Sequence, residues 1–300
     1  MAGSLLRLLA ILSLLPAAGA ADYAGSKACK TCHADLAWKF FRNPHFRDEE
    51  VLPQPGAAGC ESCHGPGSEH VKAPSKTSIF AFPVRSSEEI VTRCLSCHSN
   101  EMGRMNFRRS EHFKASLNCA SCHSIHHSPT PRRLLAKMQR ELCYTCHPSV
   151  RAQFSMPFKH RVNEGLMDCT DCHNPHGTFA PSWKMGDRPR LVSQASVNEE
   201  ACLGCHKDLR GPFVFEHTAV RVEGCETCHL PHGSANPRLL KRPVVFTLCL
   251  ECHNGTGSGR TGAGVPLTPS FHNMADPQYQ NCTICHVRLH GSNSSAIFLR

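Results

Sequence analysis

Apolar residues along this chain recur at helical spacing only over short stretches. No segment shows the alternation of apolar and polar residues that is typical of strands. Pro and Gly, 21 of each, divide the chain into turns and loops. We therefore expect short helices and loops, with turns at the Pro-His-Gly segments 175–177 and 231–233. The expected helices are 34–41, 88–97, 131–143, 198–205 and 244–252, and the longer expected loops are 52–59 and 254–264.

The longest apolar run lies close to the N-terminus, at 8–15, directly after Arg7. Small residues follow at 18–20, as at a signal-peptidase site. The run is too short to span a bilayer, which argues against the alternative of a membrane anchor. No later segment is long and apolar enough to span a membrane as a helix. We expect residues 1–20 to be a signal peptide and the mature chain to be exported.

The composition does not favour an ordinary apolar core. The 300 residues include 20 Cys and 21 His, but only 7% aromatic residues. Every cysteine belongs to a Cys-x-x-Cys-His motif, which occurs ten times. The cysteines are Cys29, Cys32, Cys60, Cys63, Cys94, Cys97, Cys119, Cys122, Cys143, Cys146, Cys169, Cys172, Cys202, Cys205, Cys225, Cys228, Cys249, Cys252, Cys282 and Cys285. The motif histidines are His33, His64, His98, His123, His147, His173, His206, His229, His253 and His286.

Cys-x-x-Cys-His is the attachment signature of a c-type haem. Two thiols at this spacing add to the two vinyl groups of one porphyrin, and the His that follows lies under the iron as its proximal ligand. A single motif could instead be half of a zinc site or a redox dithiol, and an exported cysteine-rich chain could be a disulfide scaffold. None of these alternatives needs a His after the second Cys ten times. We therefore predict ten covalently bound haems.

The remaining histidines follow the same order. The motifs form five consecutive pairs, and each pair has one His between its motifs and one after its second motif. We name these the inner and the outer histidine of each repeat. Because ten haems need ten sixth ligands, this order predicts bis-histidine iron throughout, although a single such His would more often be a surface or core residue. The inner histidines are His45, His112, His160, His217 and His272, and the outer ones are His70, His126, His176, His232 and His290.

Some assignments within this ligand set stay open. His127 is in excess and could replace His126, and His70 follows its motif His at a longer interval than the other outer histidines. A His three residues after a motif His cannot readily reach the opposite face of its own haem. We therefore expect it to ligate a neighbouring haem, whose identity the sequence does not give. The eight Met residues follow no repeat, so we expect packing or surface roles for them.

The formal charge of +9 changes once haem is considered. Each haem adds two propionates and each ferric core one positive charge, so the oxidised mature protein would carry about −2. We expect the excess of Lys and Arg to pair with propionates, and we expect no nucleic acid partner.

Few residues are available for each haem, too few for a sheet or a bundle around it. The predicted fold class is a multihaem cytochrome c with low secondary structure, in which short helices and loops wrap around ten haems without a sheet. Repeats that contact mainly their neighbours grow in one direction, so we expect an elongated chain. The predicted domains are the signal peptide 1–20 and a decahaem domain 21–300. Its five di-haem repeats cover about 24–75, 88–130, 131–190, 197–240 and 244–300.

The mature chain, about residues 24–300, resembles the MtrA/DmsE/PioA-type decahaem cytochromes. The resemblance rests on the ten paired motifs, the length, the ending Cys282-Thr-Ile-Cys285-His286 with His290-Gly291-Ser292-Asn293, and Phe-x-His before a motif, as in 158–160 and 215–217. It implies an extended haem wire inside an outer-membrane β-barrel protein. Such a wire would carry electrons between periplasmic or inner-membrane cytochromes and an extracellular cytochrome or reductase.

Iron with two histidine ligands has no open position for a substrate, so we expect an electron carrier without catalytic residues rather than an enzyme. The Cys-x-x-Cys-Lys motif that multihaem nitrite reductases carry at their catalytic haem does not occur. Two alternatives stay open: a soluble periplasmic multihaem electron shuttle, and a multihaem reductase with one open haem. The expected location is the periplasm, in association with the outer membrane.

Overall fold

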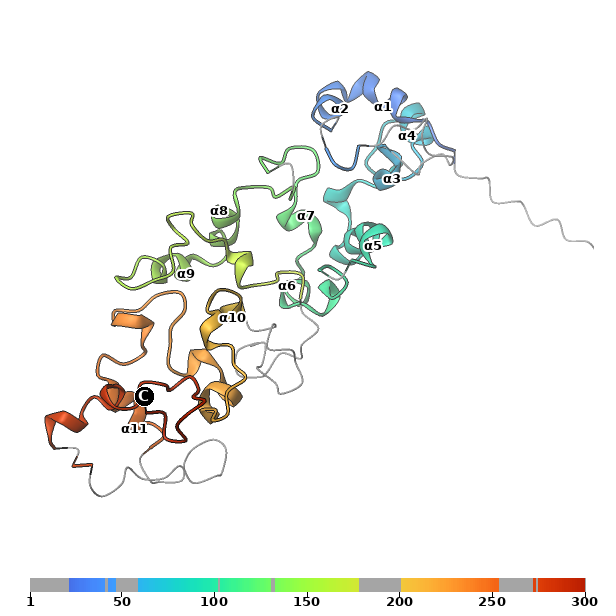
Figure 1. Cartoon of the computed structure of the whole chain (residues 1–300). Coiled ribbons are helices and arrows are strands. Elements are labelled where there is room, and N and C mark those ends of the chain that lie inside the picture. Colours follow the sequence, from blue (N-terminus) through green and yellow to red (C-terminus); the bar gives the residue numbers. More distant parts are fainter. Residues whose placement is uncertain are drawn as a thin grey trace, which may run out of the picture. The chain divides into compact units, whose positions relative to one another are not determined.

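The computed structural model describes residues 22–40, 43–46, 59–101, 103–130, 133–177, 201–253, 272–273 and 275–299. Short helices joined by loops make up this part of the chain (Figure 1). The predicted signal peptide and the predicted loop 254–264 lie outside the described residues, as does nearly all of the loop 52–59. The chain divides into two compact units, residues 1–86 and 87–300.

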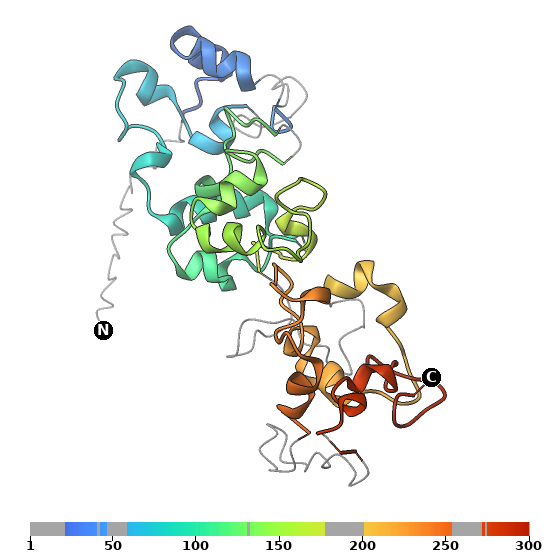
Figure 2. The same ribbon diagram turned by 90° about the vertical axis from the view of Figure 1, so that its left-hand side faces the viewer.

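The helices are short in both units. The first unit contains α1 Ser26–Cys32, α2 Ala34–Phe40, α3 Glu61–His64, α4 Ser68–Lys72 and the 3-10 turn η2 Phe82–Val84. The α-helices of the second unit are α5 Ser87–His98, α6 Glu111–Lys114, α7 Cys119–Cys122, α8 Gln139–Tyr144, α9 Pro148–Gln153, α10 Ala201–Cys205 and α11 Val245–Leu250. Figure 2 shows short coiled ribbons between the loops of the chain. The other helical turns of the second unit are η3 Phe107–Arg109, η4 Cys169–Asp171, η5 Lys207–Leu209, η6 Ala219–Glu223, η7 Cys225–Thr227, η8 Pro237–Leu239, η9 Pro277–Tyr279 and η10 Cys282–Ile284.

Where they fall on described residues, the expected helices agree with the structure except at one N-terminus; residues 198–200 of the expected helix 198–205 lie outside the described residues. Helices α2, α5, α10 and α11 occur where the sequence predicts them. The prediction of a helix over 131–143 was wrong in its first half, because α8 begins only at Gln139. Leu135, just before it, instead forms an antiparallel bridge with His123, and the carbonyl of Arg133 accepts a hydrogen bond from the His123 ring. This tertiary contact outweighs the local helical pattern.

No sheet forms among the described residues, as the sequence predicts. Backbone pairing outside the helices is limited to isolated antiparallel bridges. Two of them join a Phe-x-His segment to the His-Gly-Ser segment of the next repeat: Phe158 pairs with Ser234, and Phe215 pairs with Ser292. The bridges therefore connect successive repeats.

The apolar core of the described residues is thin, as the composition suggests. Val91 is the largest apolar side chain that is fully buried, and large apolar side chains such as Trp38 are exposed. A protein of this size ordinarily buries a larger core. The buried apolar residues are Phe40, Ile90, Val91, Phe107, Leu134, Phe154, Val162 and Leu203.

A buried carboxylate organises the first unit. Glu61, in the second haem motif, is only 3% exposed. Its Oε1 accepts hydrogen bonds from the backbone N–H of Ala24 at 2.8 Å and of Gly67 at 2.7 Å, and its Oε2 accepts one from Gly25 at 2.8 Å. Glu61 thus holds the segment before α1 against the second motif.

Replacing Glu61 with glutamine should loosen this segment. The amide group would point N–H donors at backbone donors that the carboxylate satisfies, and an unsatisfied buried donor costs about 1–3 kcal/mol. We expect faster amide exchange at Ala24 and Gly25 and earlier proteolysis near them. Glu69, which is exposed and paired with Lys72, provides the control, because Glu69→Gln should change neither measurement. Equal behaviour of both variants would contradict this role.

Candidate haem sites

The ten motifs share one local geometry. Each lies on, or at the end of, a short helical turn, as in α1, α3 and η4. In nine of them the backbone N–H of the motif His donates to the carbonyl of the first Cys at 2.8–3.1 Å, and the tenth lies within α5. One such turn brings two thiols and an imidazole together, which is the arrangement that covalent haem attachment needs.

Motif histidines face non-motif histidines across a constant distance. In eight pairs the ring centres lie 6.0–6.4 Å apart. Each pair takes one motif His and one inner or outer His, and ordinary aromatic packing would give no reason for this selection. The pairs are His33–His70, His112–His147, His123–His176, His160–His206, His173–His232, His217–His253, His229–His290 and His272–His286.

The distance fits one iron between two imidazoles. An imidazole nitrogen binds a metal ion at about 2 Å, with its ring centre about 1 Å further away, so two imidazoles on opposite faces have centres about 6 Å apart. The observed 6.0–6.4 Å agrees with this value. The described residues therefore fit a six-coordinate haem at each of the eight pairs.

The pairing follows two offsets in the second unit. The motif His of a first motif faces the inner His of the preceding repeat, as in His206 with His160. The motif His of a second motif faces the outer His of the following repeat, as in His173 with His232. The outermost described pairs differ, because His33 faces His70 and His286 faces His272, each inside a single repeat.

Hydrogen bonds fix the tautomer of many of these imidazoles. A carbonyl oxygen can only accept, so a ring that contacts it through Nδ1 carries its proton there and presents the lone pair of Nε2 to a metal. Inner histidines donate to the residue just before the outer His of the next repeat: His112 to Pro175 at 3.0 Å and His160 to Pro231 at 2.7 Å. Rings whose Nδ1 atom meets a backbone carbonyl in this way include His64, His112, His123, His160, His229 and His286. At His70 the Nδ1 atom lies 2.9 Å from the carbonyl oxygen of Ser75 and also accepts from the backbone N–H of Ser75 at 3.3 Å.

Burial keeps several of these rings neutral. Burial, followed by the nearby His123, lowers the pKa of His176 to about 4. Burial also lowers the pKa values of His123, His217, His232 and His290. A neutral imidazole is the form that binds a metal.

Glycine permits the close approach of successive repeats. A Cβ atom at Gly233, next to His232, would lie 2.0 Å from the carbonyl oxygen of Gln153. At Gly177, next to His176, it would lie 2.9 Å from the carbonyl oxygen of Asn106, and the backbone there has a positive φ of 88°. The His-Gly sequence thus places an outer His where the preceding repeat packs against it.

The cysteine sulfurs also meet in a regular order. In two repeats the first cysteines of the two motifs are hydrogen bonded, Cys143 with Cys169 and Cys94 with Cys119. Burial, followed by the nearby Cys169, raises the pKa of Cys143 to about 12. The hydrogen bond from Cys94 lowers the pKa of Cys119 to about 7. The same contact joins Cys29 to Cys60 and Cys249 to Cys282. Between repeats, second cysteines lie close together: Cys122 near Cys146, Cys172 near Cys205, and Cys228 near Cys252.

The other histidines of the predicted set are also placed. The Nδ1 atom of His45 contacts Asn43 Oδ1 at 3.1 Å, and that of His98 contacts Glu101. His126 is half-buried, whereas His127 is exposed, and their rings are 6.1 Å apart. The difference in burial favours His126 as the ligand. Sequence reasoning missed the carbonyls at Nδ1, although the Pro-His-Gly segments that supply two of them were visible.

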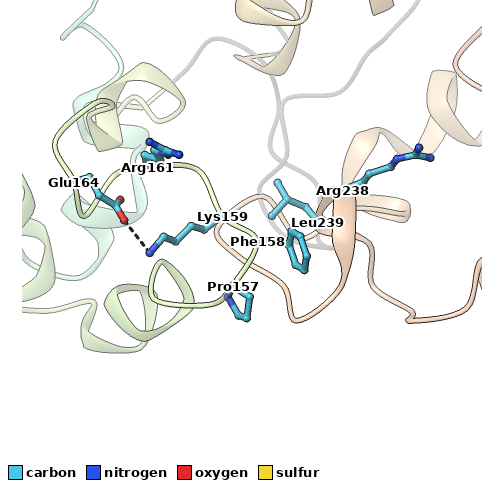
Figure 3. A pocket seen from close by; sticks show the side chains of 7 residues that line it. All are labelled: Pro157, Phe158, Lys159, Arg161, Glu164, Arg238 and Leu239. Carbon is cyan, nitrogen blue, oxygen red and sulfur yellow. Dashed lines mark ion pairs between the residues drawn. The ribbon is translucent and has the colours of Figure 1, made fainter.

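Figure 3 shows a cavity of about 450 Å³ that is lined by residues 157–159, Arg161, Glu164, Arg238 and Leu239. Lys159, Arg161 and Arg238 contribute positive charge to its lining. Lys159 points toward Glu164, and the two form an ion pair at 2.9 Å. The guanidinium of Arg238 points away from Lys159 and Arg161 in Figure 3, so the lining carries a net positive charge that is spread over the cavity.

Two further observations concern other kinds of site. Among the described residues, no group of three or more His, Cys, Asp or Glu side chains is arranged to hold a metal ion. In the same part of the chain, no helix combines the length and the apolar character needed to cross a membrane.

Two families match parts of the chain. The doubled CXXCH motif matches residues 112–152, 160–211 and 217–258. The cytochrome c554 and c-prime family matches residues 69–124.

Individual relatives extend this similarity. The chain is 33% identical over 284 residues to the multiheme cytochrome MtrA of Shewanella baltica, which covers 90% of this chain and 79% of MtrA. It is 31% identical over 94 residues to the cytochrome c-type protein NrfB of Escherichia coli, covering 31% of this chain and 50% of NrfB. It is 26% identical over 133 residues to the multiheme cytochrome MtrC of Shewanella baltica, covering 34% of this chain and 20% of MtrC.

Proposed function

Since this chain belongs to the MtrA family of multihaem c-type cytochromes, we propose that it is a decahaem wire that carries electrons between periplasmic or inner-membrane cytochromes and an extracellular cytochrome or reductase. The observation that carries the proposal is the set of eight histidine pairs at 6.0–6.4 Å. When bound, haem supplies a one-electron iron couple, and two imidazoles per iron exclude a substrate from the metal.

Ten haems are attached in this proposal, one at each Cys-x-x-Cys-His motif. The motif histidines are the proximal ligands, and the ten inner and outer histidines are the distal ligands. The pairs described above support eight of these distal ligands. Two irons, those at His64 and His98, and two histidines of the set, His45 and His126, are then left, and we propose that these two histidines are the remaining distal ligands.

The sulfur contacts support an order along the wire. Neighbouring attachment sites meet first cysteine to first cysteine within a repeat, and second cysteine to second cysteine between the repeats for which these contacts are described. Within each unit, these contacts place successive attachment sites next to one another in the order of the sequence. Haems attached there would be close neighbours, which favours short electron-transfer steps.

The basic cavity supports the expected pairing of cations with propionates. Lys159 and Arg161, which line this cavity together with Arg238, flank His160 in the sequence, and His160 is the proposed distal ligand of the haem attached at Cys202 and Cys205. Propionates are acceptors that Arg and Lys bind well. Part of the positive charge of the polypeptide would then be used inside the protein.

The proposed location is the periplasmic face of the outer membrane, with the chain held inside a β-barrel partner. The similarity to MtrA over most of both chains supports this part of the proposal. A closed barrel is the membrane structure that can enclose a polar protein without exposing its backbone to lipid.

Extraction of outer membranes in mild detergent tests the proposal. A tagged copy of the chain, expressed in its own cells, should bring down a heat-modifiable barrel protein in a stable complex. Recovery of the chain alone from the soluble periplasmic fraction would contradict the conduit and leave the soluble shuttle. Carbon monoxide should not bind to the reduced parent protein. Binding of one equivalent would instead support a reductase with an open haem.

A further inference from the structure

His98 has an unusual partner on the side of its ring that faces away from the proposed iron. Its Nδ1 atom lies 2.5 Å from Oε1 of Glu101. Helix α5 ends at His98, and a tight turn follows in which the carbonyl of Glu101 accepts hydrogen bonds from the backbone N–H of Arg104 at 2.8 Å and of Met105 at 3.0 Å. The turn therefore holds the carboxylate against the imidazole.

Other described ligand rings meet neutral acceptors at the same atom. Seven contact backbone carbonyls, as His123 does with Arg133 at 2.9 Å. Side-chain amides contact His232, through Gln153 at 2.8 Å, and His45. Among these described Nδ1 contacts, the one at His98 is made by a carboxylate. At His98, the group that meets Nδ1 is therefore a charged carboxylate, whereas at the other rings it is a neutral oxygen.

A carboxylate that accepts the Nδ1 proton makes the imidazole a stronger electron donor to its metal. Stronger donation favours ferric over ferrous iron. We propose that Glu101 is a positioning residue that lowers the reduction potential of the haem attached at Cys94 and Cys97. This inference rests on the proposed role of His98 as a haem ligand.

Arg104 limits the effect of Glu101. One guanidinium nitrogen forms an ion pair with Oε2 of Glu101 and lies 3.0 Å from Nδ1 of His98. Its positive charge withdraws part of the electron density that the carboxylate supplies. Both side chains are about half exposed, at 45% for Arg104 and 47% for Glu101, so solvent screens them further. The two residues therefore act on the haem in opposite directions.

The test is a redox titration of the holoprotein, in which the ten haems are followed by optical and electron paramagnetic resonance spectra. Glu101→Gln keeps an acceptor oxygen but removes the charge. We expect the reduction equilibrium of one haem equivalent to shift about threefold to tenfold toward ferrous iron, where tenfold corresponds to about 59 mV for one electron. Arg104→Gln should shift the same haem equivalent in the opposite direction.

Glu88→Gln is the matched control, because Glu88 lies in the same helix as His98, is similarly exposed, at 57%, and pairs with Arg108 instead of a histidine. It should shift no haem. If Glu101→Gln retains ten low-spin haems but moves none of them, the inference is wrong and the proposed function stands. Shifts of the same sign in the Glu101 and Arg104 variants would also overturn it. If the parent protein itself lacks low-spin haems, the proposed function is contradicted instead.

Discussion

Replacing His232 with alanine should convert one haem, attached at Cys169 and Cys172, from low spin to high spin. The ring of His232 faces that of His173 at 6.0 Å, and Gln153 orients it through Nδ1 at 2.8 Å. Without the side chain, the iron held by His173 keeps one protein ligand and gains an open position. Electron paramagnetic resonance should show one high-spin ferric haem, and the reduced variant should bind one equivalent of carbon monoxide.

Two further variants make this result specific. His127→Ala removes a histidine that is exposed, and it should leave all haems low spin. His232→Met should retain six-coordinate iron and raise the potential of the same haem, because methionine favours ferrous iron more than histidine does. A low-spin spectrum without carbon monoxide binding in His232→Ala would contradict the assignment of His232.

Replacing Gly233 with alanine should disturb two ligands together. The added Cβ would lie 2.0 Å from the carbonyl oxygen of Gln153, a backbone atom that cannot rotate away. The neighbouring Ser234 exchanges backbone hydrogen bonds with Phe158, at 2.8 and 3.1 Å, two residues before His160. Overpacking of this kind costs about 1–3 kcal/mol. We expect a lower midpoint of denaturation, with partial loss of low-spin character at the haems for which His160 and His232 are the proposed ligands.

Gly103→Ala is the matched control for Gly233→Ala. An added Cβ at Gly103 meets no atom within 4 Å, so stability and spectrum should match those of the parent. Denaturant titrations followed in the haem absorption bands would compare the three proteins. Equal midpoints for both variants would mean that the repeats do not pack as described at Gly233.

Sequence could predict the kinds of residue at the haem sites but not their pairing. The spacing of Cys29, Cys32 and His33 is a property of one helical turn, so a local pattern reveals it. The partner of His33 is His70, and the chain positions of the other pairs differ by 14 to 61 residues, as for His272–His286 and His229–His290. Such distances depend on how the loops fold back, which a local pattern does not contain.

The same distinction explains the error at 131–143. The local pattern in this segment favours a helix up to Cys143, but the part before Gln139 is used to cover His123. A ring nitrogen that must donate a hydrogen bond recruits the backbone of the following segment. The chain also folds back after His229 and after His286, where the carbonyls of Arg238 and Ile297 accept the hydrogen bond from the ring. Recognising this need would have shortened the predicted helix.

The exchange of ligands between neighbours has a consequence for how proteins of this kind change in length. At each described junction between two repeats of the second unit, the earlier repeat supplies its inner His to the later repeat, and the later repeat supplies its outer His to the earlier one. The first and last pairs, His33–His70 and His272–His286, instead form within a single repeat. Gene duplication or deletion of one complete interior repeat would therefore conserve the number of ligands per iron. Loss of half a repeat would leave imidazoles and irons unmatched. Evolution of such chains should thus proceed by two haems at a time, with the terminal repeats retained as caps.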